Sequence, residues 1–180
     1  MLTLKIAATE HWDSRREEFV YTKPATLSLE HSLVSVSKWE AKWGRSYFAE
    51  PPKTRAEELD YVRCMTVTQN VPPETYAAIG RNELLTIQAY INAPMTATTI
   101  KTQKHGGKSG SKVTSELVYY WMIDLGIPFE CQKWHLNRLM TLIRVCEIKS
   151  RPAKKMNRND ILRDNARLNK QRRAALQSRG

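Results

Sequence analysis

The chain has 180 residues, of which 41% are hydrophobic and 26% charged, and it includes five Trp and seven Tyr. This composition is ordinary for a globular domain and excludes a chain that is disordered throughout. The formal net charge is +11, and residues 150–180 carry +8 of it, because ten Lys or Arg face only two Asp there. The preceding part is near neutral, with 19 basic and 16 acidic residues.

No stretch reaches the 18 or so apolar residues of a membrane span, and the first residues lack the basic-then-apolar order of a signal peptide. The three cysteines show no CxxC spacing, which argues against a zinc site or a disulfide framework. We therefore expect a protein that stays in the cytoplasm where it is made, with no membrane partner.

Two short segments alternate apolar and polar residues near the N-terminus, Leu2–Ile6 and Thr26–Leu29, with Pro24 before the second. This period of two is typical of strands with one buried face. The sequence predicts that they form a small antiparallel pair.

Helix signals begin at Ser32, which can cap a helix to about Trp43, and Gly44 can end it. A second helix should start at Thr54, because Glu57 follows three residues later and completes a capping box. We expect its apolar side to include Leu59, Val62, and Cys64 or Met65.

Prolines mark the next elements. Pro72 and Pro73 open a short helix through Ile79, Asn82 is expected to cap the following helix, and Pro94 ends it. The inner face of that second helix should carry Leu84, Ile87 and Ile91.

The segment Met95–Ile100 is rich in β-branched Thr and predicts a strand or an extended link. Residues 101–112 contain three Gly and no large apolar side chain, so a mobile loop is expected. The run Gly107, Lys108 and Ser109 is similar to the end of a phosphate-binding loop, but Thr102 stands where that motif needs Gly. A nucleotide site is not expected.

Two strong helices follow, one starting at Thr114 and ending before Gly126, the other from about Glu130 to Ile148. We expect them to pack as an antiparallel hairpin at the centre of the core. The apolar faces that predict this packing are Leu117, Val118, Trp121, Met122 and Leu125 on the first, and Leu136, Leu139, Met140, Ile143 and Cys146 on the second.

The chain then changes character at Ser150. Ser150–Met156 is predicted to be a Pro- and Lys-containing linker, and Asn157 with Asp160 can cap a last helix that ends near Ser178. This helix is too polar to join the core by itself. The predicted fold is mainly α (α+β): a helical core domain over residues 1–149 with an N-terminal β pair, and residues 150–180 as linker and extended basic helix.

Catalytic and metal motifs are scarce. Cys131 and His135 lie four residues apart and could form a thiolate and base pair, but their place at the start of a core helix favours a structural role. His31 is expected to seal a helix start, and no His, Cys, Asp or Glu group has metal-ligand spacing. We expect no enzyme activity and no cofactor.

Several phrases together resemble one protein family. They are LEHSLVSVSKWEAKW (29–43), ELDYVRCMT (58–66), APMTATTI (93–100), ELVYYWMIDLGIPFECQKWHLNRLMTLIRVC (116–146) and KKMNRNDILRDNARLNKQRRAAL (154–176). The family comprises tail assembly chaperones of tailed bacteriophages with long non-contractile tails. The resemblance implies a helical protein that binds the tape-measure protein in the host cytoplasm and keeps it soluble until tail-tube subunits polymerise around it.

Two alternatives stay open: a structural component of the virion (neck, tail or capsid-associated) and, with less support, a nucleic-acid-binding protein. Self-association is also left open. A helix-binding role would use exposed aromatic and basic side chains. The candidate partner-binding residues are Trp39, Trp43, Trp134, Arg158, Arg163, Arg167, Lys170, Arg172 and Arg173.

Overall fold

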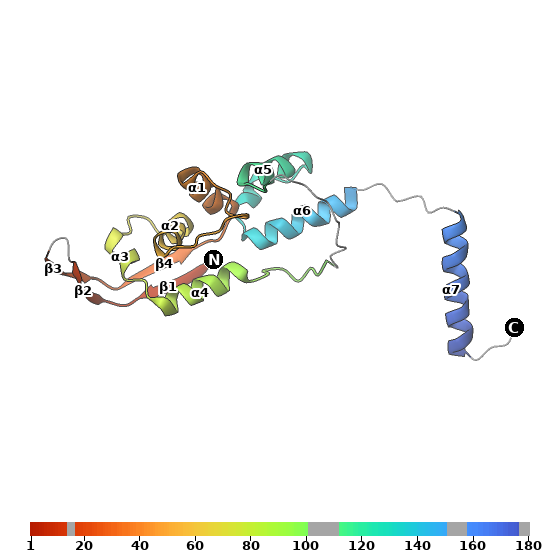
Figure 1. The fold of residues 1–180 in the computed structure, drawn as a ribbon, viewed down its shortest axis with the longest axis horizontal. Helices are drawn as coiled ribbons and strands as arrows, with labels where there is room; N and C mark the ends of the chain where they lie inside the picture. The colour runs from red at the N-terminus through yellow and green to blue at the C-terminus, as the bar shows by residue number, and fades with distance from the viewer. Residues whose placement is uncertain (14–16, 101–111, 151–157, 177–180) are drawn as a thin grey trace. The chain divides into compact units, whose positions relative to one another are not determined.

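The computed structural model describes residues 1–13, 17–100, 112–150 and 158–176 (Figure 1). The chain divides into two compact units, Met1–Glu147 and Ile148–Gly180, each described here by itself. The elements of the first unit are β1 (Leu2–Ile6), β2 (Thr9–Asp13), β3 (Glu18–Thr22), β4 (Ala25–Leu29), α1 (Leu33–Trp43), α2 (Arg55–Met65), α3 (Pro73–Ala77), α4 (Arg81–Asn92), α5 (Ser115–Asp124), the 3₁₀ turn η1 (Phe129–Lys133) and α6 (Leu136–Ser150), whose last turn passes the boundary. The second unit contains α7 (Arg158–Leu176). The mainly helical fold with an N-terminal antiparallel β element is as predicted.

The four strands form one long antiparallel ribbon in two parts. β1 pairs with β4, as expected, and the unpredicted strands β2 and β3 extend the pairing outward (Figure 1). The partners keep one register throughout, since Leu2 faces Leu29 and Thr9 faces Thr22, so each pair of residue numbers adds to 31. The ladder is interrupted beside Pro24, whose nitrogen has no hydrogen to donate.

β4 is tied into the helical body along its other edge. The backbone N–H of Glu30 donates to the carbonyl of Met65 (2.8 Å), and that of Val67 donates to Ser28 (2.8 Å). α4 contacts β1 from the side opposite this edge. The inner face of the β1–β4 pair is therefore covered, with Leu4, Ile6, Leu27 and Leu29 all buried.

The first helix starts and ends as predicted, and the second starts as predicted. Ser32 caps α1 and Gly44 ends it in the left-handed conformation, with φ at 61°. Thr54 and Glu57 form the reciprocal capping box of α2. On α2 the buried apolar residues are Tyr61, Val62 and Met65, whereas Leu59 and Cys64 are only partly buried.

The region of α3 and α4 differs from the prediction in two details. α4 begins at Arg81 after Gly80, so Asn82 lies inside its first turn and does not cap it. Ile87 and Tyr90 are its buried residues, with Leu84 and Ile91 at the edge of the core. Of the two forms predicted for Met95–Ile100, a strand or an extended link, the strand is not formed.

The predicted helix from Glu130 to Ile148 is broken at its start. Residues Phe129–Lys133 form the 3₁₀ turn η1, Trp134 is extended, and α6 begins only at Leu136. The break has a tertiary cause: Leu136 donates its N–H to the carbonyl of His31 (2.7 Å), and His135 bridges to Ser32. A continuous helix would have used that N–H internally.

α7 is a nineteen-residue helix with an exposed surface. Its side chains from Leu162 to Leu176 are exposed, except that Asp164 is half-buried and pairs with Arg167 at 3.4 Å. The helix carries six basic and two acidic residues, a net charge of +4. The expected cap at Asn157 and the predicted loop at residues 101–111 lie outside the described residues.

Candidate binding groove between α5 and α6

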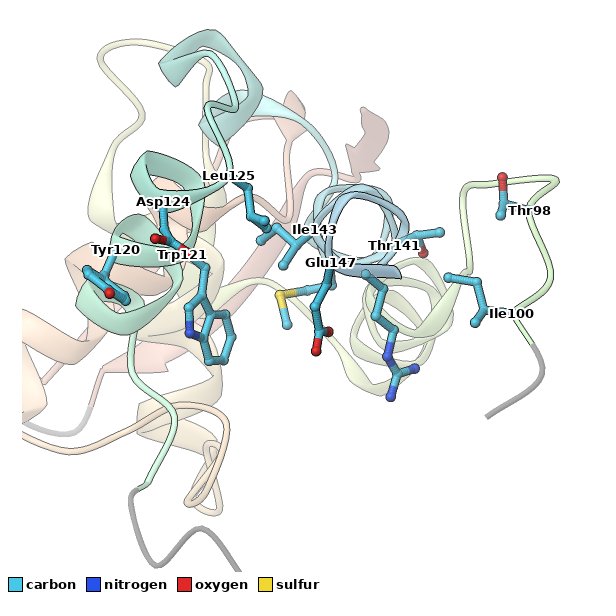
Figure 2. Close-up of a pocket in the computed structure, with 11 residues that line it drawn as sticks. Thr98, Ile100, Tyr120, Trp121, Asp124, Leu125, Thr141, Ile143 and Glu147 are labelled. Atoms are coloured by element: carbon cyan, nitrogen blue, oxygen red, sulfur yellow. The ribbon is translucent and has the colours of Figure 1, made fainter. Parts of the chain in front are cut away.

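An open groove of about 800 Å³ lies between α5 and α6 in the described part of the chain. α6 forms its floor, with α5 on one side and the segment Thr98–Ile100 on the other (Figure 2). The lining residues are Thr98, Ile100, Tyr120, Trp121, Asp124, Leu125, Met140, Thr141, Ile143, Arg144 and Glu147.

The groove exists because α5 packs chiefly on α1. Val118 and Met122 are fully buried, and Leu139 is fully buried on α6. The adjacent faces of α5 and α6, which would contact each other in the predicted hairpin, line the groove instead. The prediction that the two helices pack directly as a hairpin is therefore wrong: α5 packs on α1, and space remains between α5 and α6.

A buried carboxylate fixes the start of α5. Glu40, near the end of α1, accepts a hydrogen bond from the backbone N–H of Ser115 (2.7 Å) and another from that of Tyr47 (2.7 Å). Ser115 is the first residue of α5, where backbone N–H groups lack partners within the helix and the helix dipole favours a negative charge. Glu40 therefore holds one wall of the groove to α1.

The groove offers a mixed apolar and charged surface. Tyr120, Trp121 and Leu125 offer aromatic and aliphatic surface, and the charged Asp124, Arg144 and Glu147 line it with both signs (Figure 2). Among the described residues no three His, Cys, Asp or Glu side chains come together as metal ligands. Apolar surface with a few polar groups at its margin is typical of sites that take up a helix.

The predicted partner-binding residue Trp39 is fully buried, so the prediction that it contacts a partner is wrong. Its ring stacks on Trp43, with centroids 6.0 Å apart, and the guanidinium of Arg45 lies over both rings. Two tryptophans four residues apart on one helix face are as typical of a core as of a binding surface.

Trp43 is 37% exposed, and its indole N–H donates to Asp60 (2.9 Å). Asp60 also pairs with Lys42. The side chain thus has internal partners on α2, and it lies outside the groove.

Trp134 is half-buried, with the guanidinium of Arg138 4.1 Å from its ring centroid. It does not line the groove. The predicted basic residues Arg163, Arg167, Lys170, Arg172 and Arg173 are all exposed on α7, whose first residue is Arg158. None of the nine predicted positions is among the residues that line the groove.

Cys131 and His135 do not form a nucleophile and base pair. Both ring nitrogens of His135 are engaged elsewhere: Nε2 bonds the carbonyl of Tyr90 (3.1 Å), and Nδ1 accepts the N–H of Asn137 (3.3 Å). Burial lowers the pKa of His135.

His31 lies beside His135 in the core, with ring centroids 5.1 Å apart. The Tyr61 hydroxyl is 2.5 Å from its Nδ1, and the Tyr47 ring is a further neighbour. Burial, followed by the nearby His135, lowers the pKa of His31 to about 3. Glu30, which pairs with the amino group of Met1, faces the cluster from the side of Tyr90.

The sequence contains one signal that pointed to the groove. Tyr119, Tyr120 and Trp121 are consecutive, and a helix that packs along one face cannot bury three adjacent aromatic rings. At least one must be exposed, and Tyr120 is 58% exposed.

None of the helices in the described part of the chain combines the length and apolar character that a bilayer crossing requires. Comparison of the chain with models of protein families, with curated proteins and with solved structures found no match.

Proposed function

We propose that this chain is a bacteriophage tail assembly protein, a chaperone that binds helices of the tape-measure protein in the host cytoplasm. The identity of the partner comes from the resemblance of the sequence phrases described above. The observation that supports a helix-binding role is the open groove between α5 and α6, with its exposed aromatic wall.

The groove has dimensions that suit a helix. Met140 and Glu147 bound it along α6 and are seven residues apart, about 10 Å or two helical turns. An amphipathic helix would place apolar side chains at positions i, i+3 or i+4, and i+7 against this floor. Its polar groups would meet Asp124, Arg144 and Glu147 at the margins.

The test is co-expression of the chain with an aggregation-prone fragment of the tape-measure protein from the same phage. The wild-type chain should keep the fragment soluble and co-purify with it. Tyr120→Arg should abolish both effects, because it places a charge and a long side chain on the groove wall. Leu85→Arg is the matched control, since Leu85 is 55% exposed on α4 and does not line the groove.

A fragment that stays insoluble with the wild-type chain would refute the chaperone role. Equal loss of binding in both variants would refute the groove as the site. The structural alternative has its own signature: a virion subunit remains in purified particles, where mass spectrometry detects it, whereas an assembly chaperone leaves.

A further inference from the structure

We propose that the groove also takes up α7 of a second copy of this chain, so that two copies associate by exchanging their C-terminal helices. The proposal uses the same groove as the proposed function but does not depend on the tape-measure protein being the partner.

The first argument is that α7 presents an apolar stripe to solvent. Leu162, Leu168 and Leu176 are exposed and lie on the side of the helix opposite Arg163, Arg167 and Lys170, a side that they share with Arg172 and Arg173. A helix of this length with nothing to bury is marginal in water. It gains stability only when a partner covers the stripe.

The second argument is that spacing and size agree. Leu168 and Ala175 are seven residues apart on α7, as are Met140 and Glu147 along the groove. A volume of about 800 Å³ is large enough for several aliphatic side chains, which would displace water from the groove.

The third argument is charge. α7 carries a net charge of +4, and the groove is lined by two acidic side chains, Asp124 and Glu147, against the single basic Arg144. Opposite net charges favour this encounter over the pairing of two α7 helices, which would bring like charges together. A reciprocal exchange would also bury the same surfaces twice, as two-fold symmetric dimers do.

The test measures the mass of the full-length chain by sedimentation velocity over a hundredfold concentration range. We expect a concentration-dependent dimer. Leu168→Lys on α7 and Tyr120→Arg on the groove wall should each weaken dimerisation by about tenfold or more. Leu85→Lys should leave it unchanged. Circular dichroism of each variant checks that the fold is intact.

Mixing the two weakened variants gives the decisive measurement. The Leu168→Lys copy has an intact groove and the Tyr120→Arg copy has an intact α7, so an equimolar mixture should regain one of the two contacts and form a mixed dimer. A chain that is monomeric throughout, a dimer that neither substitution weakens, or variants that do not complement each other would overturn the proposal. The solubility assay with the tape-measure fragment is a separate readout, so failure of either proposal is recognised independently.

Discussion

Acid should destabilise the first unit well before its carboxylates titrate, because His31 is buried in a neutral state. The groups that face it are Tyr47, Tyr61 and His135, and none of them offers a negative charge at neutral pH. The carboxylate of Glu30 acts on His135 and is already paired with the amino group of Met1. A proton on His31 therefore has no compensating partner.

The direction and size of the effect follow from linkage. The pKa of His31 is about 3 in the folded chain, against 6.5 when unfolded, so the unfolded state binds the proton first as the pH falls. The stability from neutral His31 is fully present above pH 6.5 and is lost progressively below it. Between pH 7.5 and pH 5.0 this one group should lower the free energy of unfolding by about 2 kcal/mol. His135, whose pKa is also lowered, acts in the same direction.

Urea unfolding followed by tryptophan fluorescence at pH 7.5 and pH 5.0 measures this difference. The window stays above the usual range of Asp and Glu, so carboxylates contribute little. His31→Gln should be less stable at pH 7.5 but should lose about 2 kcal/mol less than wild type on going to pH 5.0. A wild-type chain whose stability is the same at both pH values, or a variant with the full wild-type pH dependence, would show that His31 is not buried as described.

Three further outcomes are expected. Leu139→Ala removes a fully buried side chain of α6 and should cost about 2 to 5 kcal/mol in urea unfolding, whereas the same change at exposed Leu85 should cost well under 1 kcal/mol. Glu40→Ala should lower the free energy of unfolding by on the order of 2 to 4 kcal/mol, because the N–H groups of Ser115 and Tyr47 lose their acceptor. Glu40→Gln should recover part of this loss. An unchanged melting temperature in both variants would refute the role given to Glu40. Binding to random duplex DNA, measured by fluorescence anisotropy, should be weak at physiological salt; if it is strong and falls by several decades per decade of salt, the nucleic-acid alternative replaces the chaperone proposal.

The elements that could be predicted are those whose cause is local. Ser32, Thr54 and Gly44 act on backbone groups within one helical turn, so their positions alone indicate where α1 begins and ends and where α2 begins. The pairing of β1 with β4 could be predicted because one face of each strand is buried, so apolar and polar residues alternate along it. β2 and β3 extend that pair, but Phe19 and Tyr21 on one face of β3 are exposed, so their alternation does not mark a buried face.

The features that could not be predicted depend on residues far apart in the chain. The break before α6 exists because Leu136 bonds to His31, and no pattern around residue 136 contains that information. The groove likewise follows from α5 packing on α1, which the apolar face of α5 does not specify. The same apolar pattern allows α5 to pack on either α1 or α6. The predicted binding residues are aromatic and basic side chains, and residue type alone does not locate the groove.

The bond between Leu136 and His31 also bears on how the chain folds during synthesis. A ribosome adds about 5 to 20 residues per second, so the 105 residues that separate these two positions take on the order of 5 to 20 s to appear. Until then the carbonyl of His31 lacks its partner Leu136, and until α5 emerges the carboxylate of Glu40 lacks its partner Ser115. The ribbon and the first four helices can assemble early, but their apolar inner surfaces stay open to other nascent chains until residues 115–147 emerge. Premature termination before α5 should therefore yield products that aggregate.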